Sequence, residues 1–164
     1  MLWSKGQMQQ FKPQIALVQI DDTFSYLRRY FSDDERIQFF FENDEHLSVQ
    51  TDENYLKSIM LNLTANAVKA LGQTVNPQIH WKAWQESKTI NISVRDNGPG
   101  ASNEQLKALY DETASSSGRH GLGLHIIRDL AKAIDCTINL KSHGAEGTEF
   151  VLSITRDNHS PSNS

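Results

Sequence analysis

Apolar residues recur along the chain at two spacings, and each spacing predicts a different kind of element. Where every second residue is apolar, we expect a strand with one buried face. A short apolar run predicts a strand at 15–20. The other predicted strands are at 37–41, around Val49, in a hairpin with arms at 79–83 and 90–94, and at 136–141 and 147–155. The 3.6-residue spacing predicts helices from an N-cap at Asp21 or Asp22 to about Ser32, from the N-cap Asp52 to Gly72, over 103–110, and over 122–134.

The order of these elements indicates the fold class. Neighbouring strands are joined by short turns and pair antiparallel, while each helix has an apolar face to pack on them. The sequence therefore predicts an α+β fold: a two-layer α/β sandwich with a mixed, mostly antiparallel sheet and its helices on one face. We expect a linker at 1–13, one domain at 14–155, and a polar, disordered tail at 156–164.

Composition excludes several classes of function. The 164 residues suffice for one domain with a core, and a net charge of −4 argues against binding to nucleic acid. No apolar run approaches the roughly 18 residues of a membrane span, and the first residues lack the core of a signal peptide. We therefore expect no membrane contact by this domain and a cytoplasmic location. The single Cys136 is expected to be buried packing.

Two glycine-containing motifs suggest the chemistry. Asp96-Asn97-Gly98-Pro99-Gly100 lies at the end of a predicted strand, where a carboxylate beside glycines offers an uncrowded hydrogen-bond acceptor. Gly121-Leu122-Gly123-Leu124 opens a predicted helix, and the bare N–H groups and positive dipole end of a helix start favour phosphate. Together the two motifs predict a site that holds both ends of a nucleotide.

The helix predicted to end at Gly72 carries a polar stripe beside its apolar one. Asn62, Asn66 and Lys69 are spaced i, i+4 and i+7, so they point within roughly 60° of one another. An Asn amide oxygen can bind Mg²⁺, and a Lys ammonium can meet phosphate oxygens. Such a stripe alone is more often a solvated helix face than a binding site.

Four segments together resemble the catalytic ATP-binding domain of sensor histidine kinases in the GHKL superfamily. Residues 56–71 resemble the asparagine box, 96–100 the first glycine box, 118–124 the second, and 147–150 the terminal Gly-Thr-x-Phe element. Their order and spacing match the family over about 14–155. The resemblance implies ATP and Mg²⁺ as cofactors.

The same resemblance implies roles for particular residues. Asp96 would accept a hydrogen bond from the adenine amine, Gly98 and Gly100 would let the base approach closely, and Thr148 would bind adenine through an ordered water. Asn66 would coordinate Mg²⁺, with Asn62 and Lys69 close by.

For the phosphate end, the resemblance implies contacts to the backbone of Gly121, Leu122, Gly123 and Leu124. Residues 101–120 would form the ATP lid, in which Arg119 and His120 are the candidates for reaching the γ-phosphate. The family's phenylalanine-rich box is not clearly present.

One departure from the wider superfamily bears on mechanism. Its hydrolysing members carry a water-activating glutamate at the position of Asn62, and an amide cannot act as a general base. We therefore expect a domain that holds ATP for transfer, and no catalytic residue is assigned within the chain.

None of the six histidines fits a phosphate acceptor on a dimerisation helix. The resemblance implies that the acceptor lies on the kinase's own dimerisation domain, of which 1–13 would be the end or the linker, and that a response regulator is the next partner. The chain is thus interpreted as part of a larger kinase, with a parent that can be anchored in the inner membrane and an isolated domain that is a monomer.

Two other hypotheses remain open from sequence. One is a serine kinase of the anti-sigma-factor type, which has the same fold and similar boxes. The other is a degenerate member that only binds nucleotide or a partner protein. The lack of ligand spacing among the histidines predicts no zinc site.

Overall fold

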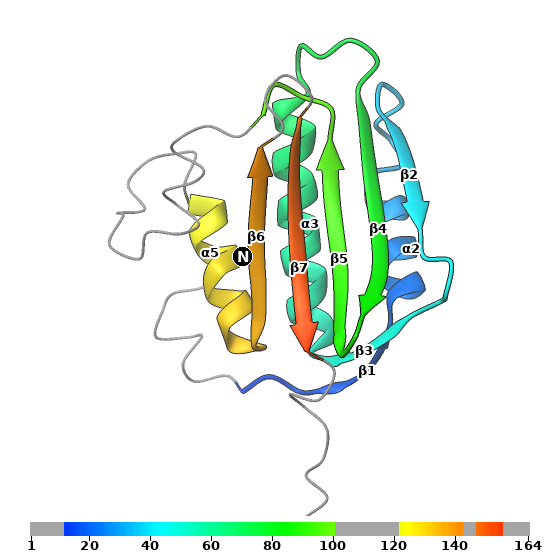
Figure 1. The fold of residues 1–164 in the computed structure, drawn as a ribbon. Coiled ribbons are helices and arrows are strands. Elements are labelled where there is room, and N and C mark those ends of the chain that lie inside the picture. Colours follow the sequence, from blue (N-terminus) through cyan, green and yellow to red (C-terminus); the bar gives the residue numbers. More distant parts are fainter. Residues whose placement is uncertain (1–11, 101–121, 143–146, 156–164) are drawn as a thin grey trace, which may run out of the picture.

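A five-stranded sheet and three helices form two layers in the computed structural model, which describes residues 12–100, 122–142 and 147–155. The sheet has the order β2 (Gln38–Glu42), β4 (Gln78–Glu86), β5 (Thr89–Asp96), β7 (Thr148–Thr155) and β6 (Cys136–Ser142). The helices α2 (Ile20–Tyr30), α3 (Glu53–Ala70) and α5 (Leu122–Ala133) cover one face of it (Figure 1). The predicted two-layer α+β fold is confirmed.

Strand pairing in this sheet is antiparallel except at one edge. The pairs β4–β5, β5–β7 and β6–β7 are antiparallel, whereas β2 and β4 are parallel. A second, two-stranded sheet pairs β1 (Ala16–Gln19) with β3 (Ser48–Thr51) antiparallel. The sheet is therefore mixed and mostly antiparallel, as predicted.

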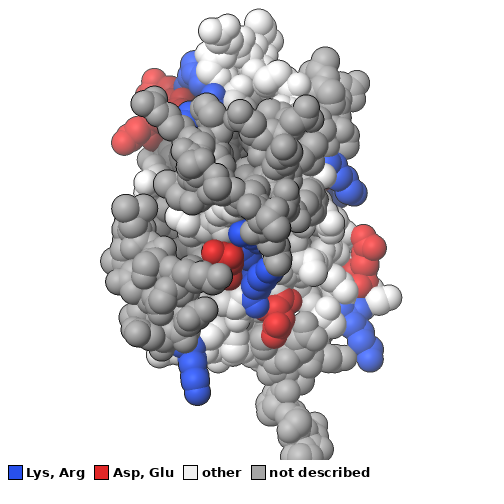
Figure 2. Space-filling view, turned by 90° about the vertical axis from the view of Figure 1, so that its left-hand side faces the viewer, with Lys and Arg blue, Asp and Glu red and all other residues white. Residues whose placement is uncertain are grey.

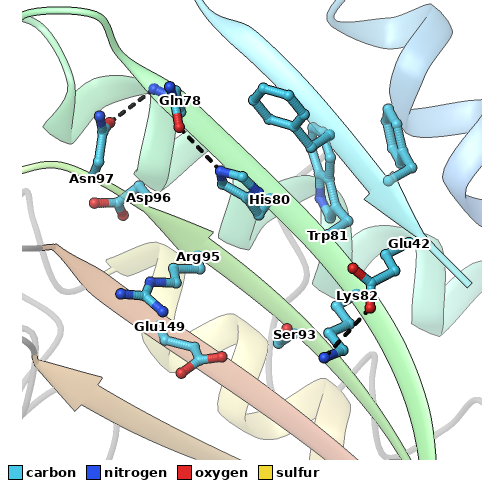
Figure 3. A pocket seen from close by; sticks show the side chains of 12 residues that line it. Glu42, Gln78, His80, Trp81, Lys82, Ser93, Arg95, Asp96, Asn97 and Glu149 are labelled. Carbon is cyan, nitrogen blue, oxygen red and sulfur yellow. Dashed lines mark hydrogen bonds and ion pairs between the residues drawn. The ribbon is translucent and has the colours of Figure 1, made fainter.

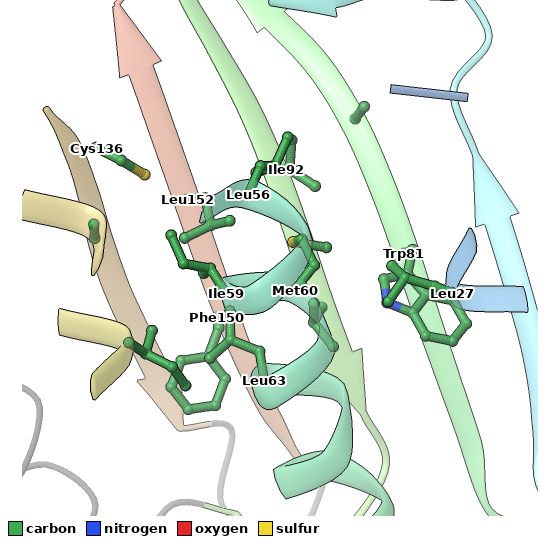
Figure 4. Close-up of a cluster of buried hydrophobic side chains, with 14 of the residues drawn as sticks. Leu27, Leu56, Ile59, Met60, Leu63, Trp81, Ile92, Cys136, Phe150 and Leu152 are labelled. Carbon is green, nitrogen blue, oxygen red and sulfur yellow. The ribbon is translucent and has the colours of Figure 1, made fainter. Parts of the chain in front are cut away.

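The core lies between the sheet and α3. Alternate residues of the two central strands face the helices, and Leu56, Ile59, Met60 and Leu63 of α3 pack on them (Figure 4). The inward set of the central strands is Ile90, Ile92 and Val94 with Phe150, Leu152 and Ile154. Cys136 is also buried, as expected, and burial raises the pKa of its thiol to about 12.

A buried indole joins the sheet to α3. Trp81 on β4 stacks on Phe41 with 4.3 Å between ring centroids, and its Nε1–H donates to Thr64 Oγ1 at 3.0 Å. The Thr64 hydroxyl in turn donates to the Met60 carbonyl at 2.7 Å. Because the donor of the indole is satisfied, a large aromatic ring can be buried here without an unpaired polar group.

Helix ends agree with the sequence pattern at one helix and differ at another. Asp52 caps α3 as predicted, since its Oδ1 accepts a hydrogen bond from Tyr55 N at 3.0 Å. The prediction that Asp21 or Asp22 caps α2 is wrong, because α2 begins at Ile20 and both residues lie in its first turn. Asp21 instead accepts a hydrogen bond from Asn43 Nδ2 at 2.8 Å, so a tertiary partner competes with the capping role.

The long helix α3 ends at Ala70, two residues before the predicted stop at Gly72. Arg36, from the connection between α2 and β2, donates through Nη1 to the Leu71 carbonyl at 2.9 Å. A cation at this position also interacts favourably with the negative end of the helix dipole.

The predicted helix at 103–110, the lid at 101–120 and the tail at 156–164 lie outside the described residues. No helix within the described ranges is both long and apolar enough to cross a membrane.

Candidate functional site

Asp96 is the last residue of β5, and it is buried, with 4% of the residue exposed. Its Oδ1 accepts a hydrogen bond from Gly98 N at 2.8 Å. Burial raises the pKa of Asp96, and the N–H groups of Gly98 and Thr148 oppose that rise without cancelling it. The structure thus holds a buried acceptor whose orientation is fixed by the turn that follows it.

Glycine is favoured at two positions after this carboxylate. A Cβ on Gly98 would lie 3.0 Å from Asp96 Oδ1, 3.3 Å from the Ala70 carbonyl and 3.4 Å from Leu71 Cδ2. The turn therefore packs tightly on the C-terminus of α3. Gly100, with φ of 99°, has a backbone conformation that disfavours side chains.

Thr148 lies directly opposite Asp96 in the β5–β7 register and is buried. The residue before it, Gly147, has φ of +115°, and a Cβ there would fall 1.9 Å from the Asp96 carbonyl oxygen. The backbone of 147–148 is thus pressed against the Asp96 peptide. Three predicted site residues, Asp96, Gly98 and Thr148, are brought together at one end of the sheet.

The polar stripe of α3 is unevenly buried. Asn62 and Asn66 are half-buried and Lys69 is exposed. Asn62 Nδ2 donates to the Ser58 carbonyl at 2.7 Å, so this amide bonds to its own helix. Asn66 Nδ2 is buried and has no hydrogen-bond partner within the described part of the chain. A buried amide without a partner fits a residue whose partner is a ligand.

The fit of Asn66 to a metal follows from its amide chemistry. A half-turn of the amide exchanges its nitrogen and oxygen, so the unpartnered position can present an oxygen. Oxygen ligands suit Mg²⁺, which keeps several waters and takes few protein groups when it is bound with phosphates. Among the described residues, no group of three or more acidic, His or Cys side chains forms an alternative metal site.

The second glycine motif opens a helix, as predicted. The helix α5 begins at Leu122, includes Gly123 in its first turn, and packs against α3. Leu124 is buried in the core, so only its backbone is left for a ligand. Arg119, His120 and Gly121 lie outside the described residues.

Sequence reasoning gave no role to His125, the residue after this motif. It is 7% exposed, and its Nε2 has no hydrogen-bond partner in the ranges that the structure describes. The sequence offered one sign of this: His125 is a polar residue directly after Leu124 in an otherwise apolar helix start.

A hollow with a volume of about 690 Å³ lies elsewhere on the described surface. It opens on the helix-free face of the sheet over β2, β4 and β5 (Figure 3). His80 there stacks on Phe40 with 4.5 Å between centroids, and Lys82 pairs with Glu42 at 3.4 Å. Of the predicted site residues only Asp96 borders this hollow, so it is not the site that the motifs define.

Charged side chains are mixed on the described part of the face that carries α5. Figure 2 shows basic and acidic groups beside one another there. On α5 itself, Arg128 Nε lies 3.7 Å from the Asp129 carboxylate.

Comparison with known proteins agrees with this geometry. The pattern that defines the histidine kinase-, DNA gyrase B- and HSP90-like ATPase family matches residues 51–158, and the chain belongs to that family. The sensor protein CiaH of Streptococcus pneumoniae is 29% identical over 87% of this chain and 34% of its own length. The sensor histidine kinase ZraS of Escherichia coli is 32% identical over 69% of this chain and 24% of its own length. The chain thus spans about a third or less of these relatives.

Solved structures show the same fold. The catalytic domain of histidine kinase ThkA in a nucleotide-free form superposes with a TM-score of 0.74 at 24% identity, over 87% of this chain and 97% of that one. Full-length ShkA in complex with AMPPNP gives a TM-score of 0.74 at 22% identity, over 90% of this chain and 33% of that one. The described architecture is that of a histidine kinase catalytic domain.

Proposed function

We propose that this chain is the catalytic domain of a sensor histidine kinase, which binds Mg-ATP and donates the γ-phosphate to a histidine on a separate dimerisation domain. The observation that carries the proposal is the buried carboxylate of Asp96, held by the Gly98 turn opposite Thr148. The family match and the similarity to sensor kinases support the same reading.

Two regions of the site would bind different parts of the nucleotide, one the base and the other the phosphates. Asp96 would accept a hydrogen bond from the adenine amine, the glycine turn would admit the base, and Thr148 would bind it through a water. Asn66 would hold Mg²⁺, with Asn62 and Lys69 nearby. The ion, when bound, neutralises phosphate charge. The start of α5 at Leu122 and Gly123 would offer N–H groups to phosphate oxygens.

In the transfer itself, a nitrogen of the acceptor imidazole would form a bond to the γ-phosphorus while the bond to the β,γ-bridging oxygen breaks, leaving ADP. The partners would be the dimerisation domain and, through it, a response regulator. The ThkA kinase has been crystallised in complex with the response regulator TrrA, which supports a response regulator as a partner. We also propose that the domain works in the cytoplasm and is a monomer on its own.

Titration calorimetry of the chain with ATP and Mg²⁺ tests the proposal. The chain should bind, and Asp96→Ala should weaken binding on the order of a hundredfold, because a charged hydrogen-bond acceptor is lost. Asp44→Ala, at an exposed aspartate in the turn between β2 and β3, is the matched control and should bind like the unchanged chain. Equal affinity for ATP in the two variants would contradict the assignment of Asp96 to the binding site.

A second measurement tests the transfer. With γ-labelled ATP and the dimerisation domain of its parent kinase supplied separately, label should appear on a histidine of that domain. Label on a serine of a protein antagonist would instead support the anti-sigma-factor type of kinase.

A further inference from the structure

Asn97 lies between the carboxylate of Asp96 and the tight turn at Gly98, and its side chain reaches the connection before β4. Its Oδ1 accepts a hydrogen bond from Gln78 N at 2.8 Å (Figure 3), and its Nδ2 donates to the Asn76 carbonyl at 3.0 Å. Its backbone N–H donates to the Gln78 carbonyl at 3.3 Å. One residue thus makes three hydrogen bonds to a segment about 20 positions away.

These bonds end the β4–β5 ladder in an unusual way. The register pairs Ile79 with Asp96, so Gln78 is the next residue opposite Asn97. Opposed residues of an antiparallel hydrogen-bonded pair normally exchange two backbone bonds. Here the bond from Gln78 N ends on the Asn97 side chain instead of its carbonyl. The main chain can thus leave the sheet at Asn97, although the N–H of Gln78 still has a hydrogen-bond acceptor.

Two other segments press on the same peptide. A Cβ on Gly147 would lie 3.0 Å from Asn97 Cα, and one on Gly98 would touch the end of α3. The Asp96–Gly98 turn is therefore enclosed by the 147–148 backbone, by α3 and by the Asn97 amide. Of the three, the amide is the element that a substitution can remove without filling space.

We propose that Asn97 is a positioning residue that aims the Asp96 carboxylate at the nucleotide base and so sets base selectivity. This rests on the proposed function, in which Asp96 recognises adenine. Asn97 itself would touch neither base nor phosphate. Its role is to hold the start of the glycine turn, because a buried acceptor discriminates between bases only while its direction is fixed.

The test compares ATP with GTP, since a change of aim alters selectivity whereas a loss of stability does not. In Asn97→Ala, both side-chain bonds to the 76–78 segment are gone, and we expect ATP affinity to fall about tenfold while GTP affinity changes little. The ratio of the two affinities should therefore shrink about tenfold. Asn97→Asp keeps the acceptor for Gln78 N but loses the donor to Asn76. Its ATP-to-GTP affinity ratio should therefore lie between that of the unchanged chain and that of Asn97→Ala.

Asn43→Ala is the matched control. Asn43 also bonds two partners through its amide, Asp21 Oδ1 at 2.8 Å and Leu47 N at 3.0 Å, but it lies in the β2–β3 turn. Its loss should lower the melting temperature and leave the ATP-to-GTP ratio unchanged. An unchanged ratio in Asn97→Ala, with a lowered melting temperature alone, would overturn the positioning role. Failure of the unchanged chain to bind ATP would instead overturn the proposed function.

Discussion

At the scale of single residues, the proposed site has a carboxylate, Asp96, at a place where burial disfavours its ionised form. Burial raises the pKa of Asp96 above its ordinary value, so the carboxyl is harder to ionise in the folded chain than in the unfolded one. Ionisation therefore opposes folding. The penalty grows as the pH rises from about 4 through the raised pKa, and it is constant above that.

Asp96→Asn should consequently stabilise the fold at neutral pH while it weakens ATP binding. The uncharged amide can still accept the Gly98 hydrogen bond and avoids the burial of charge. Thermal unfolding followed between pH 3.5 and 8 measures the gap in melting temperature. It should be present at pH 7 and close below about pH 4; a gap that is independent of pH would contradict this account.

The residues of the site were predictable to different degrees. Asp96 and Gly98 are near in sequence, so a strand followed by a glycine turn indicated them directly. Thr148 lies far along the chain, and only the β5–β7 register places it opposite Asp96. The need for Gly147 was not predicted, because its cause is the approach of a distant peptide.

At the scale of elements, helices and strands followed from periodicity, while their junctions did not. The cap of α3 was predictable because Asp52 bonds a residue three positions on. The start of α2 was not, because Asp21 takes partners from the β2–β3 turn. The join between β4 and α3 through Trp81 and Thr64 was likewise invisible in the sequence, since it depends on how the layers face each other.

That join gives a prediction for stability. Thr64→Val preserves shape but leaves the buried Trp81 Nε1–H without an acceptor, which costs about 1–3 kcal/mol. Urea unfolding followed by tryptophan fluorescence measures the loss. Thr137→Val is the matched control, because the Thr137 hydroxyl is exposed and bonds weakly to the Ser153 carbonyl at 3.5 Å. Similar losses in the two variants would show that the indole hydrogen bond contributes little.

At the scale of the whole molecule, the described parts of the motifs lie on the helix-covered side of the sheet, at the end where β5 ends and β7 begins. A hollow of about 690 Å³ lies on the opposite face, so shape alone would have pointed to a different place. The order of motifs in the sequence indicates the helix-covered side instead, because resemblance carries information on ligand chemistry that a surface depression does not.

A domain that supplies phosphate to another domain has to keep ATP intact until the acceptor arrives. The resemblance implies that Asn62 stands where hydrolysing members have glutamate. Its amide donates to the Ser58 carbonyl at 2.7 Å and offers no base to a water. Asn62→Glu should therefore raise the rate of phosphate release from Mg-ATP about tenfold or more. Asn62→Gln, equal in length to glutamate but without a basic group, should leave the slow rate unchanged. Phosphate release measured without any acceptor domain separates the two variants, and equal rates in both would show that the absence of a base at this position does not protect ATP.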